Sequence, residues 1–313
     1  MPRAKSSEAT ASTSCILQRE VSVNDSKAED TLTFYGQSFA SRLLLGTARY
    51  ESPRQLADAI RAADPALLTV SVRRQLPGGR PGSQDGGNSF WDLMRETGRN
   101  ILPNTAGCRT VRDAVNTACM ARALFATNLI KLEIIGDEAS LQPDPFGLVE
   151  ATIELVKLGF QVLPYCTEDW VLCQRLLDAG CEVLMPWAAP IGTGQGPRNP
   201  AALRELRQRV PHTPLIIDAG IGLPSHACQV MEWGFDGVLL NTAISRAIDP
   251  VLMAGAFSAS IQAGRAAYLA GPMEVQTSAV PSTPEIGRPF KGDSCGSARF
   301  TLAPGTLGII GIE

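Results

Sequence analysis

Lys131 and Glu133 are the two residues of this chain whose placement most directly suggests chemistry. They lie two positions apart in the segment 128–135, Asn-Leu-Ile-Lys-Leu-Glu-Ile-Ile, which has the pattern of a buried β-strand. A buried ammonium group costs several kcal/mol unless it is paired. We therefore expect Lys131 to be a Schiff-base amine whose pKa is lowered by burial, so that the amine spends time unprotonated.

The spacing of Lys131 and Glu133 places both side chains on one face of the strand, about 7 Å apart along it. The apolar residues Ile130, Leu132 and Ile134 then face the opposite side. Two interpretations follow for the charged face. The pair is either a buried ion pair that fills the interior, or an imine-forming lysine with a carboxylate beside it for proton transfer.

Two later segments carry residues suited to holding a phosphorylated ligand. The first, 218–222, reads Asp-Ala-Gly-Ile-Gly, and its glycines let the backbone approach a ligand closely and present amides to it. The second, 241–243, reads Asn-Thr-Ala and precedes a predicted helix. Each segment alone is a weak signal. Together they predict a phosphate site with the Asp218 carboxylate beside it.

A glycine-rich loop, 190–196, reads Pro-Ile-Gly-Thr-Gly-Gln-Gly. It is not a dinucleotide-binding fingerprint, because it follows a late strand and does not open a helix. A flexible turn is one interpretation, and we favour a loop that covers a ligand. Tyr165 and Trp187, at predicted strand ends, either line a pocket or only pack. Asp144 is most simply a helix N-cap.

The elements that must position these residues form an alternation of short apolar runs and amphipathic helices. The runs start 22 to 34 residues apart, which suits strand–loop–helix units. The eight runs are 42–45, 67–72, 101–104, 128–135, 160–164, 182–186, 214–218 and 237–241.

Boundary residues support the same division. Helix starts are marked by an N-cap residue and a proline, and helix ends by a glycine in the position that follows a C-cap. The pairs are Ser52-Pro53, Asp144-Pro145 and Asp249-Pro250, and the glycines are Gly159, Gly180 and Gly234.

Eight strands and eight helices are the count of a single (β/α)8 TIM barrel. An open doubly wound sheet is the competing fold, but it usually has fewer strands and an early glycine-rich turn. The active site of a TIM barrel lies at the carboxyl ends of its strands. Lys131 and Glu133 face that place, so we favour the catalytic interpretation of the pair.

Composition divides the chain into three parts. Residues 1–30 are predicted to be a disordered tail, 31–271 the barrel, and 272–313 a low-complexity tail rich in Pro, Gly, Ser and Thr. The stretch 73–88 is predicted to be a Gly/Pro-rich loop that contains Arg73 and Arg74.

The net charge of −3 argues against nucleic acid or an anionic membrane as a partner. No apolar run approaches the roughly 20 residues of a membrane span. The eight cysteines include no Cys-x-x-Cys pair, and only His212 and His226 are histidines, so we expect no metal site and no cofactor. The N-terminus lacks the apolar core of a secretory signal, so we expect reduced thiols and a cytoplasmic location.

Seven ordered segments resemble the thiazole synthase family of thiamin biosynthesis. They run collinearly through the predicted barrel, as 42–47, 102–107, 130–133, 163–165, 189–196, 218–222 and 241–243. One segment departs from the family pattern. The family commonly has Gly-Thr-Gly-Lys after the first strand, whereas this chain has Gly46, Thr47, Ala48 and Arg49.

The resemblance implies a metal-free barrel that condenses 1-deoxy-D-xylulose 5-phosphate, dehydroglycine and sulfur into a thiazole phosphate carboxylate. The sulfur comes from the C-terminal thiocarboxylate of a small ubiquitin-like carrier protein. The imine-forming lysine of the family falls on Lys131, and its paired acids fall on Glu133 and Asp218. The sugar-phosphate contacts fall on Gly192, Ala219, Gly220, Asn241 and Thr242. Family members are oligomers, which implies a homo-oligomer that uses helix faces such as 109–126 and 249–270.

Two other functions stay open from the residues. One is a class I aldolase-like barrel that uses Lys131 to cleave a carbon–carbon bond of a sugar phosphate, which leaves the loop 192–196 unexplained. The other is a non-catalytic barrel that binds a sugar phosphate or scaffolds the carrier. Only the thiazole synthase reaction needs the carrier's thiocarboxylate. We expect a groove for the carrier at the loops after the second and sixth strands.

Overall fold

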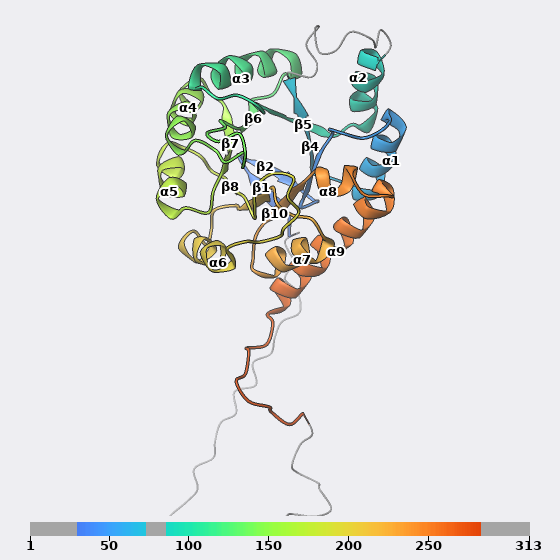
Figure 1. Cartoon of the computed structure of the whole chain (residues 1–313), viewed down its shortest axis with the longest axis vertical. Coiled ribbons are helices and arrows are strands. Elements are labelled where there is room, and N and C mark those ends of the chain that lie inside the picture. The colour runs from blue at the N-terminus through green and yellow to red at the C-terminus, as the bar shows by residue number, and fades with distance from the viewer. Residues whose placement is uncertain (1–29, 73–85, 283–313) are drawn as a thin grey trace, which may run out of the picture. The chain divides into compact units, whose positions relative to one another are not determined.

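Eight parallel strands form the wall of a barrel, and the helices that connect them surround it (Figure 1). The computed structural model describes residues 30–72 and 86–282. Residues 1–29 of the predicted tail, most of the tail at 272–313 and most of the loop at 73–88 therefore lie outside the described residues. The last residues of that loop are not loop, because α2 (Gly86–Thr97) begins there. The last residue of the first tail, Asp30, was wrongly assigned to it, because its carboxylate pairs with Arg42 and Arg265.

The wall of the barrel follows chain order. Its strands are β3 (Leu43–Gly46), β4 (Leu67–Ser71), β5 (Asn100–Asn104), β6 (Leu129–Leu132), β7 (Gln161–Cys166), β8 (Met185–Pro186), β9 (Ile216–Asp218) and β10 (Gly237–Leu240). The sheet runs β8-β7-β6-β5-β4-β3-β10-β9, and each neighbouring pair is parallel.

A bridge between Leu184 and Leu215 joins the two ends of this sheet. The Leu184 amide donates to the Pro214 carbonyl at 3.1 Å, and the Ile216 amide donates to the Leu184 carbonyl at 3.0 Å. These bonds bring β8 and β9 together and nearly close the barrel. The predicted (β/α)8 TIM barrel is therefore confirmed.

The helices begin where their capping residues predict. The side chains of Ser52, Asp144 and Asp249 each accept a hydrogen bond from an amide of the first helical turn. The remaining bounds are α1 (Pro53–Ala63), α3 (Val111–Phe125), α4 (Pro145–Lys157), α5 (Trp170–Asp178), α6 (Pro200–Arg209), α7 (Pro224–Glu232), α8 (Thr242–Ser245) and α9 (Pro250–Ala270).

An antiparallel hairpin, β1 (Leu32–Phe34) and β2 (Gln37–Phe39), precedes the barrel and was not predicted. Its apolar residues Leu32, Phe34 and Phe39 share one buried cluster with residues that face the barrel interior. Those interior residues include Leu67, Leu129 and Ile216, which are the first residues of β4, β6 and β9. The hairpin thus fills the amino-terminal end of the barrel.

The pleat of β6 decides where its charged residues point. Ile130, Leu132 and Ile134 belong to the apolar layer between strands and helices, which also holds Leu148 and Leu155 of α4. Leu129 belongs instead to the interior cluster. Because side chains alternate along a strand, Lys131 and Glu133 also face the interior, as predicted.

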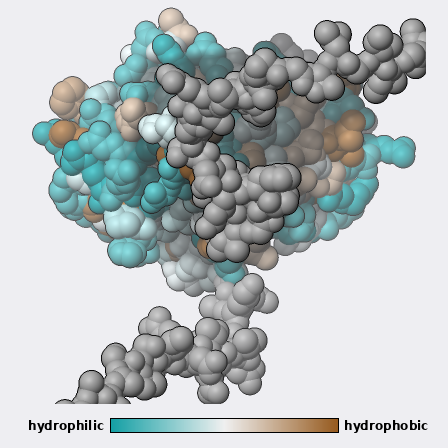
Figure 2. Space-filling model, turned by 90° about the horizontal axis from the view of Figure 1, so that it is seen from below, coloured by the Kyte–Doolittle hydropathy of each residue, from teal (hydrophilic) through white to brown (hydrophobic). Residues whose placement is uncertain are grey.

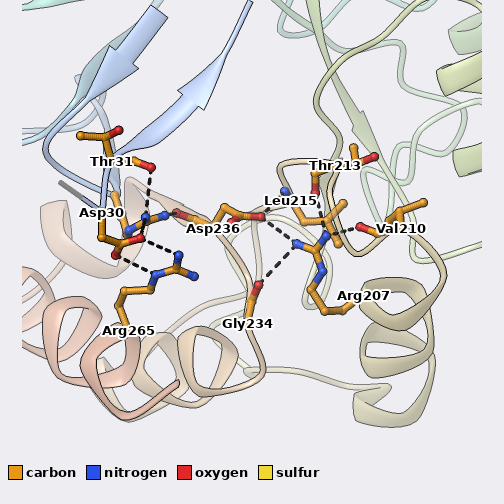
Figure 3. A network of polar contacts seen from close by, with 10 residues as sticks. Asp30, Thr31, Arg207, Val210, Thr213, Leu215, Gly234, Asp236 and Arg265 are labelled. Carbon is orange, nitrogen blue, oxygen red and sulfur yellow. Dashed lines mark hydrogen bonds and ion pairs between the residues drawn. The ribbon is translucent and has the colours of Figure 1, made fainter. Parts of the chain in front are cut away.

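A polar network ties the start of the described chain to the amino-terminal end of the barrel (Figure 3). The Asp30 carboxylate lies 2.7 Å from both Arg42 and Arg265, the latter on α9. Arg42 also donates to the Asp236 carbonyl at 2.8 Å, and the Asp236 carboxylate lies 2.7 Å from Arg207 on α6. Arg42 and Asp236 immediately precede β3 and β10, so the network lies at the amino-terminal end of the barrel and links its elements there.

The chain divides into two units, Met1–Gly271 and Pro272–Glu313. The barrel belongs to the first, and the described part of the second, 272–282, has no helix or strand. The face of the chain in Figure 2 carries mainly hydrophilic residues, with hydrophobic ones in small groups. Among the helices of the described residues, none combines the length and apolar composition of a membrane span.

Candidate active site at the carboxyl ends of the barrel strands

A cavity of about 1480 Å³ lies at the carboxyl ends of the barrel strands. A pocket for one drug-sized ligand usually measures about 300–1,000 Å³, so this cavity has room for more than one reactant. Every residue predicted for the site lines it, namely Lys131, Glu133, Asp218, Gly192, Ala219, Gly220, Asn241 and Thr242.

Lys131 lies between two carboxylates at the inner wall of the cavity. Its Nζ is 3.0 Å from Oε1 of Glu133 and 2.7 Å from Oδ2 of Asp218. The three residues are 5%, 5% and 3% exposed, so water screens these contacts weakly. The ammonium also lies 5.7 Å from the centre of the Tyr165 ring. Tyr165 is fully buried, so it packs beneath the site and does not line the cavity.

The charge state of Lys131 differs from the sequence-based expectation. Burial alone lowers the pKa of its ammonium group, but the negative charges of Asp218 and Glu133 outweigh burial and raise that pKa above its usual value. The expectation of a lowered pKa is therefore wrong for the free protein. It failed because the sequence does not show that Asp218, from β9, reaches Lys131 across the barrel.

Burial also raises the pKa of the Asp218 carboxyl. The Lys131 ammonium opposes this effect and the Glu133 charge adds to it. A carboxyl group with a raised pKa, 2.7 Å from a protonated amine, is suited to take the proton that the amine must lose before it can act as a nucleophile.

The glycine-rich loops after β8 and β9 pack closely against each other. The Gly196 amide donates to the Gly220 carbonyl at 2.8 Å. A Cβ atom added at Gly220 would lie 2.3 Å from the Ala189 nitrogen, and one added at Gly222 would lie 2.2 Å from the Gly194 oxygen. These glycines therefore let one loop approach the other, in addition to any approach to a ligand.

Backbone donors of these loops remain available to the cavity. Ala219 has a φ of 72°, a left-handed conformation that is unusual for a residue with a side chain. Gly192, with a φ of 78°, borders open space. Within the described part of the chain, the amides of Gly192 and Gly220 donate to no protein acceptor. Such amides suit an anion.

Asn241 joins the loop after β10 to the loop after β3. With its amide nitrogen turned toward that loop, it donates to the Ala48 carbonyl at 2.9 Å and to the Gly46 carbonyl at 3.2 Å. A Cβ atom added at Gly46 would lie 2.5 Å from Cβ of Asn241. Thr242 then begins α8, whose first amides have no partner within the helix.

Several cavity residues were not predicted as part of the site. Arg246 and Arg49 are exposed cations that line it, and among the described residues neither forms an ion pair. The signal in the sequence was a basic residue shortly after the first and the eighth strand. Phe90 of α2 and Met253 of α9 add apolar lining.

Of the two loops predicted to form a groove, only one is described near the cavity. Ile191, Gly192 and Gly194 of the loop after β8 line it, whereas residues 73–85 after β4 lie outside the described residues. Trp187 borders a separate cavity of about 420 Å³ and donates its indole N–H to Glu168.

The chain is similar to known proteins of one family. The family described as Thiazole biosynthesis protein ThiG matches residues 33–284. The thiazole synthase of Variovorax paradoxus strain S110 is 62% identical over 261 residues, which are 83% of this chain and 94% of that protein. The thiazole synthase of Neisseria gonorrhoeae is 61% identical over 259 residues, 83% of this chain and 97% of that protein.

A solved structure is also similar. The Amycolatopsis orientalis BexX/CysO complex contains a chain that is 32% identical, with a TM-score of 0.71, and the match covers 80% of this chain and 100% of that one. The family match and these relatives show that the chain belongs to the thiazole synthase family and is an enzyme that forms the thiazole of thiamin.

Proposed function

We propose that this thiazole synthase joins 1-deoxy-D-xylulose 5-phosphate, dehydroglycine and the sulfur of a thiocarboxylated ubiquitin-like carrier protein, through an imine on Lys131. The product is the thiazole phosphate carboxylate from which thiamin is made. The observation that carries the proposal is the position of Lys131, within 3.0 Å of Glu133 and 2.7 Å of Asp218, in a cavity large enough for several reactants. Family membership favours this reaction over the aldolase-like alternative.

The first step requires a neutral amine. In the proposed sequence, Lys131 passes a proton to Asp218 as the sugar ketone arrives, and the free amine then attacks the carbonyl carbon. Loss of water gives the imine. The contact of 2.7 Å between Nζ and Oδ2 supports this transfer, because a proton-transfer partner must be within hydrogen-bond reach.

The next steps are proton shifts next to the imine. The imine draws electrons from the neighbouring carbon, which loses a proton, and the carbonyl group can then migrate and accept sulfur. We assign these shifts to Glu133 and Asp218, because both carboxylates contact the nitrogen that carries the imine.

The phosphate is assigned to the loops after β8, β9 and β10, through Gly192, Ala219, Gly220, Asn241 and Thr242. Support comes from the free amides of Gly192 and Gly220 and from the unpaired amides that open α8. The side chain of Asn241 has a second task, because it holds the loop after β3. Arg49 and Arg246 supply positive charge at the same cavity, which favours anionic reactants.

A carrier protein is assigned to the opening of the cavity. The chain of similar fold in the BexX/CysO complex is found with a protein partner, which supports a partner for this chain as well. We also propose a homo-oligomer and a cytoplasmic location. Leu252 of α9, 72% exposed, lies on one of the helices expected to serve self-association.

Trapping tests the imine. The protein is incubated with 1-deoxy-D-xylulose 5-phosphate, reduced with borohydride and digested, and the adduct is located by peptide mass spectrometry. Lys157, exposed on α4, serves as the internal control. We expect an adduct on Lys131 and none on Lys157. A folded protein that binds the sugar phosphate but yields no Lys131 adduct would exclude the mechanism.

A further inference from the structure

The Thr105 side chain forms hydrogen bonds with both the backbone amide and the backbone carbonyl of Glu133. Its hydroxyl accepts a hydrogen bond from the Glu133 amide at 2.8 Å and donates one to the Glu133 carbonyl at 2.8 Å. Its own amide donates to the Lys131 carbonyl at 3.1 Å. Thr105 is fully buried, so water does not compete for these bonds.

These bonds replace strand pairing where pairing stops. β6 ends at Leu132, one residue before Glu133, and its pairing with β5 is limited to Asn104 and Lys131. The chain after β5 turns away at Thr105, whose carbonyl accepts from the Cys108 amide at 3.0 Å. Without the hydroxyl, the Glu133 amide and carbonyl would both be buried without these partners.

Thr105 is separated from the reactants themselves. Its neighbours Asn104, Ala106 and Gly107 line the cavity, whereas Thr105 is not part of the lining. Its hydroxyl can therefore affect the reaction only by positioning the residues to which it is hydrogen-bonded. The residue bonded at both its amide and its carbonyl is Glu133, and the carboxylate of Glu133 lies 3.0 Å from the Lys131 amine.

We propose that Thr105 is a positioning residue that fixes the Glu133 carboxylate against the Lys131 amine. The inference rests on the proposed function, because it gives Glu133 a proton-transfer task that depends on its distance from the imine. A displacement of about 1 Å in such a group can cost about 100-fold in rate. A hydroxyl that prevents that displacement contributes to turnover without touching a reactant.

The test uses two substitutions at Thr105 and one matched control in the full-length chain. Thr105→Val keeps the shape and removes the hydroxyl, whereas Thr105→Ser keeps the hydroxyl. The control is Thr152→Val in α4, because Thr152 is also fully buried and donates its hydroxyl to a backbone carbonyl, that of Leu148, at 2.8 Å. Each variant is measured for Tm, kcat, KM for the sugar phosphate, and the pH dependence of borohydride trapping.

We expect Thr105→Val to lower kcat about 10- to 100-fold and to leave KM within about 3-fold. Its trapping should also reach half of its maximum at a lower pH, because a displaced Glu133 no longer helps to raise the pKa of Lys131. Thr105→Ser and Thr152→Val should keep the pH dependence of the unaltered protein.

Two kinetic results would overturn the inference. One is a folded Thr105→Val enzyme with unaltered kcat and pH dependence, and the other is a Thr105→Ser enzyme as impaired as Thr105→Val. If Thr105→Val does not fold, Thr105→Ala takes its place. If neither Thr105→Val nor Thr105→Ala folds while Thr152→Val does, Thr105 is required for folding, and the positioning role is rejected.

A structural measurement separates this inference from the proposed function. If the unaltered protein binds the sugar phosphate but forms no Lys131 adduct, the proposed imine mechanism is wrong, and the position of Glu133 can still be examined. Crystal structures of the unaltered protein and of Thr105→Val would then be compared for the distance from Lys131 Nζ to Glu133 Oε1. We expect it to exceed 3.0 Å in the variant, and an unchanged distance would reject the inference.

Discussion

Nζ of Lys131 lies 2.7 Å from Oδ2 of Asp218, although β6 and β9 are not neighbours in the sheet. The contact spans the interior of the barrel and joins an ammonium to a carboxylate whose pKa is raised by burial. The charged form of Lys131 is therefore favoured, and the Asp218 carboxylate that can accept its proton lies beside it. A buried ammonium in this setting is compatible with imine chemistry because its proton has somewhere to go.

Removing the Asp218 charge should change the pH at which Lys131 reacts. Asp218→Asn removes the larger of the two electrostatic contributions that raise the Lys131 pKa, so half-maximal borohydride trapping should move to lower pH. The measurement is the pH dependence of trapping, normalised to its own maximum. Asp178→Asn, at an exposed site on α5, is the control. A half-maximal pH that stays the same in Asp218→Asn would contradict this account of the charge state.

Replacing Lys131 by arginine should separate charge from chemistry. Arginine keeps a cation between Glu133 and Asp218 but does not form the imine, because its guanidinium stays protonated. We expect Lys131→Arg to fold and to lose at least about 1,000-fold in kcat, a loss of roughly 4 kcal/mol of transition-state stabilisation. Lys157→Arg on α4 is the matched control. Substantial activity in Lys131→Arg would support a barrel that does not use an imine.

Adding one methyl group at Gly46 should displace Asn241 and disturb the loops after β3 and β10, to which the proposed function assigns the phosphate. The Cβ atom of Gly46→Ala would lie 2.5 Å from Cβ of Asn241, so Asn241 must shift and its bonds to the loop after β3 must lengthen. We expect a loss of about 1–3 kcal/mol in unfolding free energy, the usual cost of overpacking, together with a raised KM for the sugar phosphate.

The matched control for Gly46→Ala is Gly255→Ala in α9. A Cβ atom there meets nothing within 4 Å, and alanine is the better helix former. Urea unfolding of both variants makes the comparison. Equal stability of Gly46→Ala and the unaltered protein would show that the Asn241 contact tolerates displacement.

The exposed arginines of the cavity should act on binding more than on turnover. We expect Arg246→Ala and Arg49→Ala each to raise the KM for anionic reactants about 3- to 10-fold, with kcat nearly unchanged. Added salt should reduce the difference, because exposed charges are screened. Arg175→Ala on α5, away from the cavity, is the control. KM values that do not respond to either substitution would remove these arginines from the binding site.

The Asp30 network should make stability depend on acid pH. Contacts with Arg265 and Arg42 lower the pKa of Asp30 below its usual 3.8. A carboxyl group with a lowered folded-state pKa stabilises the protein above its unfolded-state pKa, and this contribution is lost as pH falls through the folded-state value.

We expect Asp30→Asn to lower the unfolding free energy at pH 7 by about 1–2 kcal/mol, a modest loss because Asp30 is partly exposed to water. The difference from the unaltered protein should shrink as the pH falls below 3.8. Asp58→Asn, which breaks an exposed ion pair with Arg61 on α1, is the control and should change stability little. Urea unfolding at a series of pH values measures the unfolding free energy of the unaltered protein and of both variants.

Much of the barrel was predictable because its parts are encoded locally. Proline after a capping residue starts helices at Pro53, Pro145 and Pro250, and buried strands are short apolar runs. The run 182–186 exceeded its strand, since β8 comprises only Met185 and Pro186 and Leu184 forms an isolated bridge to Leu215. The hairpin was missed because its two strands have three residues each, too few to show a period.

The parts of the site that escaped prediction depend on distances between segments remote in sequence. The larger of the two contributions that raise the pKa of Lys131 comes from Asp218, 87 positions later, whose approach no local pattern shows. The role of Gly46 depends in the same way on Asn241. Lys131 and Glu133 were predictable because one strand fixes their common direction.

The β1–β2 hairpin has a consequence for the order of events. Within the described residues, the hairpin fills the amino-terminal end of the barrel, and the cavity that contains Lys131 lies at the opposite end, where reactants enter. On the proposed function, the tail of the carrier protein inserted there would block the exit of a smaller molecule bound deeper in the cavity. On the proposed function, the sugar phosphate must enter before the carrier, so steady-state kinetics should follow a compulsory sequence that begins with the small molecule.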